Sequence, residues 1–227
     1  MKNVFFDIGG TLLAPRRIET LHSLLKEWGT ERPVGDVREA YRQADLRWED
    51  VYGRNALLGQ EAEKSFNERN KIVFTLLGLG DRADLMERFD RDARRSWVKD
   101  KLYPDAEPCL RKLRDEGFRV GLISNASPPM QGVVERLGLN RYAEVVVISE
   151  LVGMAKPDPA IFHHTMRLSN VDPADSVYVG DFYKIDVVGA RGAGMEGVLI
   201  DREGRYDGGV DCPTIASLDG LREHLDD

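Results

Sequence analysis

Residues 5–12 read FFDIGGTL, and they place a single acidic residue, Asp7, between an apolar run and two glycines. The run from Lys2 to Ile8 is short and apolar at its centre, a pattern typical of a buried strand followed by a tight turn. A carboxylate at the end of a buried strand either satisfies the turn or takes part in chemistry. The remainder of the sequence has to decide between these two interpretations.

Four further runs share the form of the first, each short, apolar and ending in Ser or Asp. They are RVGLIS (119–124), EVVVIS (144–149), SVYVGD (176–181) and GVLID (197–201). Helical patterns separate them, opened by Ser127-Pro128 and by Asp158-Pro159 in the way a capping residue and a first-turn proline open a helix. This alternation from residue 102 onward predicts βαβ units, a parallel sheet, and ligand chemistry at the carboxyl ends of its strands.

Residues 16–98 follow a different pattern, because their apolar positions recur at helical spacing with no strand-like run between them. We therefore expect two domains. Residues 1–15 and 99–227 would form an α/β core, and residues 16–98 would form a helical insert placed after the first strand.

The composition excludes several classes of protein. The chain has 227 residues, of which 42% are hydrophobic and 31% charged, with a net charge of −7 and no basic run suited to nucleic acid. No apolar stretch approaches the roughly 18 residues that span a bilayer. The two cysteines, Cys109 and Cys212, are far apart and have no metal-ligand spacing, which favours a reducing cytoplasm over a disulfide framework. The oligomeric state is not predicted.

A parallel sheet would gather several of the chain's polar side chains at one edge: Asp7, Ser124, Asn125, Lys156, Asp181 and Asp186. Crowded carboxylates repel one another unless a cation joins them. Aspartates are oxygen ligands of the kind that hold a divalent metal with several waters, whereas Ser, Asn and Lys are donors suited to an anionic oxygen. The combination indicates Mg²⁺ and a phosphoryl group, and hence a small-molecule phosphate ester as substrate.

The order of these pieces resembles the haloacid dehalogenase-like hydrolase superfamily, in its phosphatase branch with an inserted helical cap. Asp7–Leu12 (DIGGTL) stands where the family has Asp-x-Asp-Gly-Thr-Leu, and Leu122–Asn125 (LISN) resembles the second motif. Lys156-Pro157 resembles the third, and Gly180-Asp181 followed by Asp186 the fourth. The resemblance spans nearly the whole chain and implies an α/β fold, with a three-layer, parallel-sheet, Rossmann-like core and an inserted α-helical cap.

The resemblance also implies a metal site and a nucleophile. Asp7 would attack phosphorus and form an aspartyl phosphate. Mg²⁺ would be held by Asp7, by Asp181 and by the backbone carbonyl of Gly9, and Asp186 would support the metal directly or through water.

A second set of residues would hold the transferred phosphoryl group. Ser124, the amide of Asn125 and Lys156 would bind its oxygens, and Lys156 would also offset the repulsion between an anionic nucleophile and an anionic substrate. Asp7, Ser124 and Lys156 are therefore the expected catalytic residues.

Gly9 departs from the family pattern, because the family's phosphatases usually carry an aspartic acid there that protonates the leaving oxygen. Glycine keeps the backbone carbonyl for the metal but cannot transfer a proton. General acid–base catalysis contributes about 10²- to 10⁴-fold, so we expect a slow enzyme, a substitute acid, or a preference for esters with good leaving groups.

Two alternatives stay open. The superfamily's 2-haloacid dehalogenases use the same nucleophile without a metal and also lack the second aspartate, although such a site has little use for Asp181 beside Asp7. The other alternative is a non-catalytic or very slow relative that binds a phosphorylated metabolite, because fold and function separate easily.

Overall fold

The structure is a computed structural model that describes residues 3–96 and 101–225. The chain divides into two compact units. One unit comprises Met1–Ala14, Gly53–Gly59 and Lys101–Asp227, and the other comprises Pro15–Tyr52 and Gln60–Asp100. The predicted end of the insert at residue 98 lies outside the described residues, and the predicted extent of the insert, 16–98, stays a prediction.

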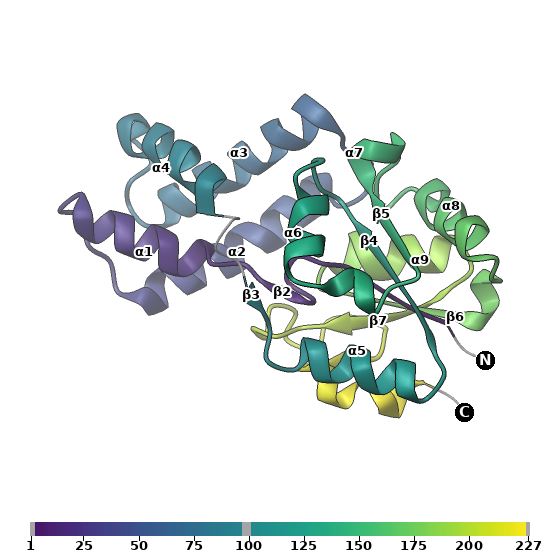
Figure 1. Cartoon of the computed structure of the whole chain (residues 1–227). Helices are drawn as coiled ribbons and strands as arrows, with labels where there is room; N and C mark the ends of the chain where they lie inside the picture. Colours follow the sequence, from purple (N-terminus) through teal and green to yellow (C-terminus); the bar gives the residue numbers. More distant parts are fainter. Residues whose placement is uncertain (1–2, 97–100, 226–227) are drawn as a thin grey trace. The chain divides into compact units, whose positions relative to one another are not determined.

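The first unit is built on a six-stranded sheet in the order β5-β4-β1-β6-β7-β8, with every neighbouring pair parallel (Figure 1). The strands are β1 (Asn3–Phe6), β4 (Arg119–Ser124), β5 (Val145–Ile148), β6 (Ser176–Gly180), β7 (Glu196–Ile200) and β8 (Thr214–Ile215). The predicted α/β class and parallel sheet are confirmed. The sixth strand is a two-residue edge strand, too short to show as a sequence pattern.

Helices cover both faces of this sheet because successive strand residues point to opposite sides. Val4 and Phe6 of β1 belong to one buried cluster, whereas Phe5 belongs to another. The first cluster includes residues of α5 (Ala106–Asp115), α6 (Met130–Arg136) and η5 (Leu218–His224), and the second includes residues of α8 (Pro159–Ser169) and α9 (Gly189–Gly192). The core is therefore three-layered, as expected, and its central strand is buried on both faces.

The two predicted helix starts differ in outcome. At α8 the Asp158 carboxylate accepts a hydrogen bond from the Ala160 N–H at 2.8 Å, and Pro159 opens the first turn, as predicted. The prediction for Ser127 is wrong, because α6 begins at Met130 and has no side-chain cap. Two consecutive prolines follow Ser127, and the residue before a proline is disfavoured in helical conformation, so the helix starts only beyond them.

Short elements complete the first unit. β2 (Leu13–Ala14) pairs antiparallel with β3 (Lys101–Leu102), an unpredicted ribbon formed by the two segments that flank the helical insertion. The remaining short helices are η2 (Leu139–Arg141), α7 (Ser149–Val152), η3 (Pro173–Asp175) and η4 (Tyr183–Val188).

The second unit consists of helices with a core of its own. The helices are α1 (Arg17–Glu27), α2 (Val34–Tyr52), α3 (Gly59–Leu76) and α4 (Ala83–Ser96). Residues at the predicted helical spacing, such as Leu21, Leu25, Tyr41 and Val73, are buried together. Among the described residues, no helix combines the length and apolar character needed to cross a bilayer.

This helical unit also buries a charged group, which we call the arginine cluster: Asp45, Arg17 and Arg69. The Asp45 side chain is fully buried and accepts hydrogen bonds from the Arg17 guanidinium, one of them 3.0 Å long. The Arg69 Nη1 lies 3.6 Å from Asp45 Oδ1, the oxygen that also accepts from Arg17 Nη1. A carboxylate without water is stable only when it is paired in this way.

Candidate active site

Three predicted site residues come from three adjacent strands at the centre of the sheet. Asp7 directly follows β1, Ser124 is the last residue of β4, and Asp181 directly follows β6. Phe6 pairs with Leu122 on one side and with Val179 on the other, so the ends of these strands lie at one level. The Asp7 N–H continues this ladder by donating to the Val179 carbonyl at 2.8 Å. The parallel register therefore brings together residues far apart in the sequence.

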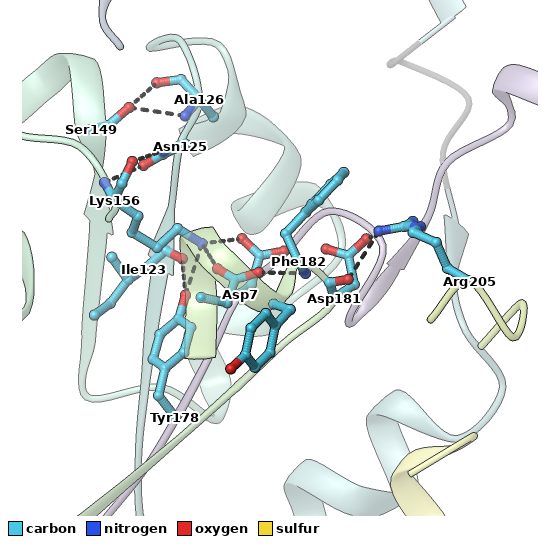
Figure 2. Close-up of polar contacts among 12 residues, drawn as sticks. Asp7, Ile123, Asn125, Ala126, Ser149, Lys156, Tyr178, Asp181, Phe182 and Arg205 are labelled. Carbon is cyan, nitrogen blue, oxygen red and sulfur yellow. Dashed lines mark hydrogen bonds and ion pairs between the residues drawn. The ribbon is translucent and has the colours of Figure 1, made fainter. Parts of the chain in front are cut away.

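Lys156 is the centre of a buried polar group, which we call the lysine cluster: Lys156, Asp7, Asp186 and Tyr178. The Lys156 Nζ donates to Asp7 Oδ1 at 2.7 Å and to Asp186 Oδ1 at 2.7 Å. It also donates to the Tyr178 hydroxyl at 2.9 Å, and that hydroxyl donates to the Ile123 carbonyl at 2.9 Å (Figure 2). All three ammonium hydrogens thus have acceptors, and the ammonium group is fixed beside the Asp7 carboxylate.

The backbone of Lys156 is held by Asn125, the residue after β4. The Asn125 side chain donates to the Lys156 carbonyl and accepts from the Lys156 N–H, both at 2.8 Å (Figure 2). Next to this pair, the Ser149 hydroxyl bonds the backbone of Ala126. The carboxamide of Asn125 is therefore committed to positioning Lys156, and Ser124, buried in the sheet, lies one residue before it.

Burial and charge set the protonation of the lysine cluster. Burial raises the pKa of Asp7 to about 6, and the nearby Asp186 carboxylate adds to the rise, while Lys156 opposes it. Burial would lower the pKa of Lys156, but the contacts with Asp186 and Asp7 overcome this and hold that pKa well above its ordinary value. Two carboxylates share one ammonium here, so the cluster carries a surplus of negative charge when both are ionised.

Asp186 is placed by the helical turn η4. Its Oδ2 accepts from the Phe182 N–H at 2.9 Å, while its Oδ1 accepts from Lys156. A Cβ on Gly180 would lie 2.3 Å from the Asp186 carboxyl carbon, so the glycine at the end of β6 is required for this close approach. Both carboxylate oxygens of Asp186 are therefore engaged within the protein.

Asp181 lies between the first loop and a buried arginine that sequence reasoning missed. A Cβ on Gly10 would lie only 2.4 Å from Asp181 Oδ2, which places this carboxylate against the turn that follows Asp7. The Arg205 Nη2 donates to the same oxygen at 3.4 Å, and its Nη1 donates to the Asp181 backbone carbonyl at 3.0 Å (Figure 2). Asp181 thus has a cation of its own, separate from Lys156.

The fit of a divalent metal can be judged from the donor set. Within residues 3–96 and 101–225, no three His, Cys, Asp or Glu side chains are grouped to hold a metal ion. Mg²⁺ binds through one or two carboxylates and keeps several waters. The Asp181 carboxylate beside the Gly9–Gly10 turn, the Gly9 carbonyl and the negative surplus around Asp7 fit such a water-rich site, and Asp186 is not needed as a direct ligand.

Gly9 is exposed and has open space beside it. No heavy atom beyond its chain neighbours lies within 4 Å of where a Cβ would stand, and its φ is not in the left-handed region. By contrast, Gly10 has a φ of +83° and no room for a side chain. An aspartate at position 9 would therefore be tolerated by the fold, and its absence is not forced by sterics.

Known proteins resemble this chain in sequence and in fold. Residues 1–194 match the family model of haloacid dehalogenase-like hydrolases. A glyceraldehyde 3-phosphate phosphatase of Methanopyrus kandleri is 32% identical, with the alignment covering 100% of this chain and 96% of the relative. A phosphoserine phosphatase of Thermus thermophilus is 32% identical, with 98% and 97% covered.

One similar solved structure is named as a dehalogenase and not as a phosphatase. The 2-haloacid dehalogenase of Pseudomonas syringae pv. Tomato DC3000 is 25% identical, with a TM-score of 0.59 and with 99% of this chain and 98% of that chain covered. Phosphatases and a dehalogenase therefore share this architecture, and the fold alone does not choose between them. The family itself is shown by the match over most of the chain and by the full-length relatives: the chain belongs to the haloacid dehalogenase-like hydrolases.

Proposed function

We propose that this hydrolase is a Mg²⁺-dependent phosphatase that acts on a small phosphorylated metabolite through an aspartyl-phosphate intermediate. The observation that carries the proposal is the Asp7 carboxylate, which is buried at the centre of the strand ends and fixed by Lys156 at 2.7 Å. The two full-length relatives, named for glyceraldehyde 3-phosphate and phosphoserine, support a small phosphate ester as substrate.

Asp7 would act as the nucleophile. One of its oxygens attacks phosphorus, a new P–O bond forms, and the ester P–O bond breaks with its electron pair leaving on the substrate oxygen. Water then attacks the same phosphorus, which releases inorganic phosphate and regenerates the carboxylate. The contact from Lys156 to Oδ1 limits rotation of the carboxylate, which holds it ready for in-line attack.

The phosphoryl oxygens would be bound by Ser124, by the backbone N–H of Asn125 and by Lys156. Ser124 ends β4 beside β1, Asn125 follows it, and the Asn125 side chain fixes Lys156. Ser124 and the Asn125 backbone N–H would need little reorganisation, because the end of β4 fixes them before substrate arrives. The three hydrogens of Lys156 are engaged with Asp7, Asp186 and Tyr178, so one of these contacts would give way to the phosphoryl group. Asp186, with Tyr178, keeps the Lys156 ammonium in place.

Mg²⁺ would be held by Asp7, by the Gly9 carbonyl and by Asp181, with water completing its shell. When bound, it supplies positive charge that stabilises the transferring phosphoryl group. A direct contact from Asp186 stays a prediction, and we assign Asp186 first to Lys156 because both of its oxygens are already hydrogen-bonded. A cytoplasmic location also stays a proposal, supported by two free thiols, Cys109 and Cys212.

The glycine at position 9 narrows the substrate class. With no acid to protonate the leaving oxygen, esters whose leaving group is weakly basic, such as acyl, anomeric sugar or nitrophenyl phosphates, would react faster than alkyl phosphates. Because the space beside Gly9 is open, Gly9→Asp should fold. We expect it to raise kcat on alkyl phosphates by about 10- to 100-fold and to change nitrophenyl phosphate turnover much less.

The test is a screen of phosphate esters with Mg²⁺, run beside Asp7→Asn. We expect phosphate release from the wild-type chain and a loss of at least about 10³-fold in the variant, because the nucleophile is gone. The panel would include glyceraldehyde 3-phosphate, phosphoserine, an acyl phosphate and 4-nitrophenyl phosphate. Equal turnover of alkyl and nitrophenyl esters would contradict the leaving-group preference while leaving the phosphatase proposal intact.

The same assay separates the alternatives. Chloride release from a 2-haloacid without added metal, with no phosphate released from any ester, would assign the chain to the dehalogenases. Saturable binding of phosphate esters with no turnover of any compound would make it a binding relative. Either result would overturn the proposed function.

A further inference from the structure

The segment after β7 builds a fixed position for one arginine. The Asp201 carboxylate, directly after the strand, accepts from the Arg205 N–H at 2.7 Å and from the Tyr206 N–H at 3.0 Å. The Arg205 guanidinium carbon lies 4.4 Å from the ring centre of Phe182, a cation–π contact. With 8% of its side chain exposed, Arg205 is among the least accessible charged groups of this sheet edge. These contacts hold the Arg205 side chain in a nearly buried position.

The guanidinium of Arg205 contacts one residue at two points. Nη1 donates to the Asp181 carbonyl at 3.0 Å, and Nη2 lies 3.4 Å from Asp181 Oδ2. The first contact fixes the backbone of Asp181, and the second restrains rotation of its side chain. A planar guanidinium is suited to such a two-point hold, which a lysine ammonium cannot reproduce.

Gly10 also lies close to the Asp181 carboxylate. A Cβ on Gly10 would lie 2.4 Å from Oδ2, so this close approach requires a glycine in the turn. The fixed arginine thus holds Asp181 beside the backbone of the first loop. Groups that act on a metal ligand from outside the metal's own shell orient that ligand, and their loss typically lowers metal affinity by about 10- to 100-fold.

We propose that Arg205 is a positioning residue that holds Asp181 in the orientation needed to bind the divalent ion, and so sets the affinity of the site for that ion. This inference rests on the proposed function, because it takes Asp181 as a metal ligand. It assigns to a loop residue a role in metal binding that does not require contact with the metal or the substrate.

Two effects of Arg205 oppose each other, and the geometry decides between them. Its positive charge would repel a divalent cation, which would weaken binding. Its two-point hold removes the cost of ordering the carboxylate, which strengthens binding. The contact with the carboxylate, at 3.4 Å, is longer and weaker than the contact with the backbone carbonyl, at 3.0 Å, so Arg205 competes only weakly with a metal for the Asp181 carboxylate. We therefore expect orientation to dominate.

The experiment measures binding of Mg²⁺ alone, and of Mn²⁺ alone as a spectroscopic probe, to the full-length chain by calorimetry and by electron paramagnetic resonance. For Arg205→Gln we expect Kd to rise by about 10-fold or more. For Arg205→Lys, which keeps the charge but loses the planar fork, we expect a rise of about 3- to 10-fold. Turnover at saturating metal should change less than Kd, because Asp181 still binds the ion when the metal concentration is high enough to fill the site.

Arg191→Gln is the matched control. It removes one positive charge from an ion pair with Asp211 that is exposed to water. Its Kd for Mg²⁺ should equal that of the wild type. If Arg205→Gln does not fold, as judged by its melting curve without metal, Arg205→Lys alone decides the question.

Each outcome supports or overturns the inference. An unchanged Kd in both Arg205 variants, or tighter binding in Arg205→Gln, would show that Arg205 does not position Asp181 or acts only as a competing charge. A wild-type chain that binds neither ion would overturn the proposed metal dependence together with the inference. A wild-type chain that binds Mg²⁺ while the Arg205 variants do so equally well would overturn the inference alone.

Discussion

Each unit of this chain buries a cluster of charges, and the two clusters have opposite compositions. In the lysine cluster of the α/β unit, one ammonium is shared by two carboxylates, Asp7 and Asp186. In the arginine cluster of the helical unit, one carboxylate is shared by two guanidinium groups, Arg17 and Arg69. Both satisfy the rule that a buried charge needs a partner, but only the first leaves negative charge in surplus.

The exposure of the charged ends shows what each cluster does. The guanidinium side chains of Arg17 and Arg69 are 18% and 15% exposed, so part of their charge reaches water around a fully buried Asp45. The side chains of Lys156 and Asp186 are 2% exposed, and that of Asp7 is 9% exposed. A buried cluster with excess negative charge is stabilised by a further cation or by a proton, which is the property expected of a site that binds a cation.

The largest effect is expected in the arginine cluster. Asp45→Asn removes the carboxylate and leaves two guanidinium groups together in a mostly buried site. Removing one partner of a buried ion pair is strongly destabilising. We expect a loss of about 3 kcal/mol in unfolding free energy, reduced somewhat by the partial exposure of the arginines. That corresponds to a fall of about 6 to 12 °C in Tm, measured by circular dichroism.

Glu39→Gln is the control for that variant, because Glu39 lies on the same helix and pairs with Arg42 on the exposed surface. No measurable change in Tm is expected there. If the Asp45 variant is as stable as the wild type, the arginine cluster does not stabilise the helical unit, and the proposed difference in role between the two clusters is wrong.

Asp7→Asn, by contrast, should raise the unfolding free energy of the metal-free protein. A carboxyl whose pKa is about 6 when folded, against an ordinary 3.8, binds more protons in the folded state between these pH values, so it costs stability as the pH rises through that window. The penalty at pH 7.5 is at most about 3 kcal/mol. Asparagine avoids it, while Lys156 loses part of one contact, so we expect a net gain of about 1 to 2 kcal/mol in the metal-free protein.

Thermal unfolding in the presence of a chelator at pH 4 and pH 7.5 checks this expectation. The gain should be present at pH 7.5 and much smaller at pH 4, because at pH 4 Asp7 is protonated in the folded wild type and only about half ionised in the unfolded chain, whose carboxyl has the ordinary pKa of 3.8. A variant less stable than the wild type at pH 7.5 would mean that the Lys156–Asp7 contact stabilises the fold by more than the burial of the Asp7 charge destabilises it.

The smallest effect concerns the neutral member of the lysine cluster. Tyr178→Phe removes the hydroxyl that accepts from Lys156 and donates to the Ile123 carbonyl. The ammonium would keep its two carboxylates but lose part of its fixed direction, and we expect kcat on 4-nitrophenyl phosphate to fall about 10-fold with KM changed less.

Tyr142→Phe serves as the control for that change, because the Tyr142 hydroxyl bonds Glu107 on the exposed surface. It should leave kcat and KM unaltered. If Tyr178→Phe lowers only thermal stability and leaves kcat intact, the hydroxyl acts on the fold and not on the position of Lys156.

Much of the candidate site could be predicted because it follows strand ends. Asp7, Ser124 and Asp181 each close an apolar run, and parallel pairing brings the ends of such runs to one edge. Tyr178 was missed although its hydroxyl interrupts the apolar run VYVG. A polar atom within a strand buried on both faces has to find a partner, so this signal was available.

Other features had no usable signal. Arg205 lies in an irregular segment after β7, and nothing in its sequence spacing points toward Asp181. The predicted helix opening at Ser127-Pro128 is wrong because a second proline follows, and α6 begins only at Met130. Whether Asp186 faces a lysine or a metal is likewise not encoded in its spacing from Asp181.

The sequence by itself determined the parallel α/β core and the candidate residues that end its strands, because hydrophobic period and the residues that end each strand are local properties of the chain. The order of the motifs along the chain indicated the family. Only the tertiary structure decided how these residues divide into partners: Asp7 and Asp186 around Lys156, and Asp181 with Arg205. The physical reason is that charges of a few ångströms' separation are paired by the packing of distant segments, which no spacing along the chain records.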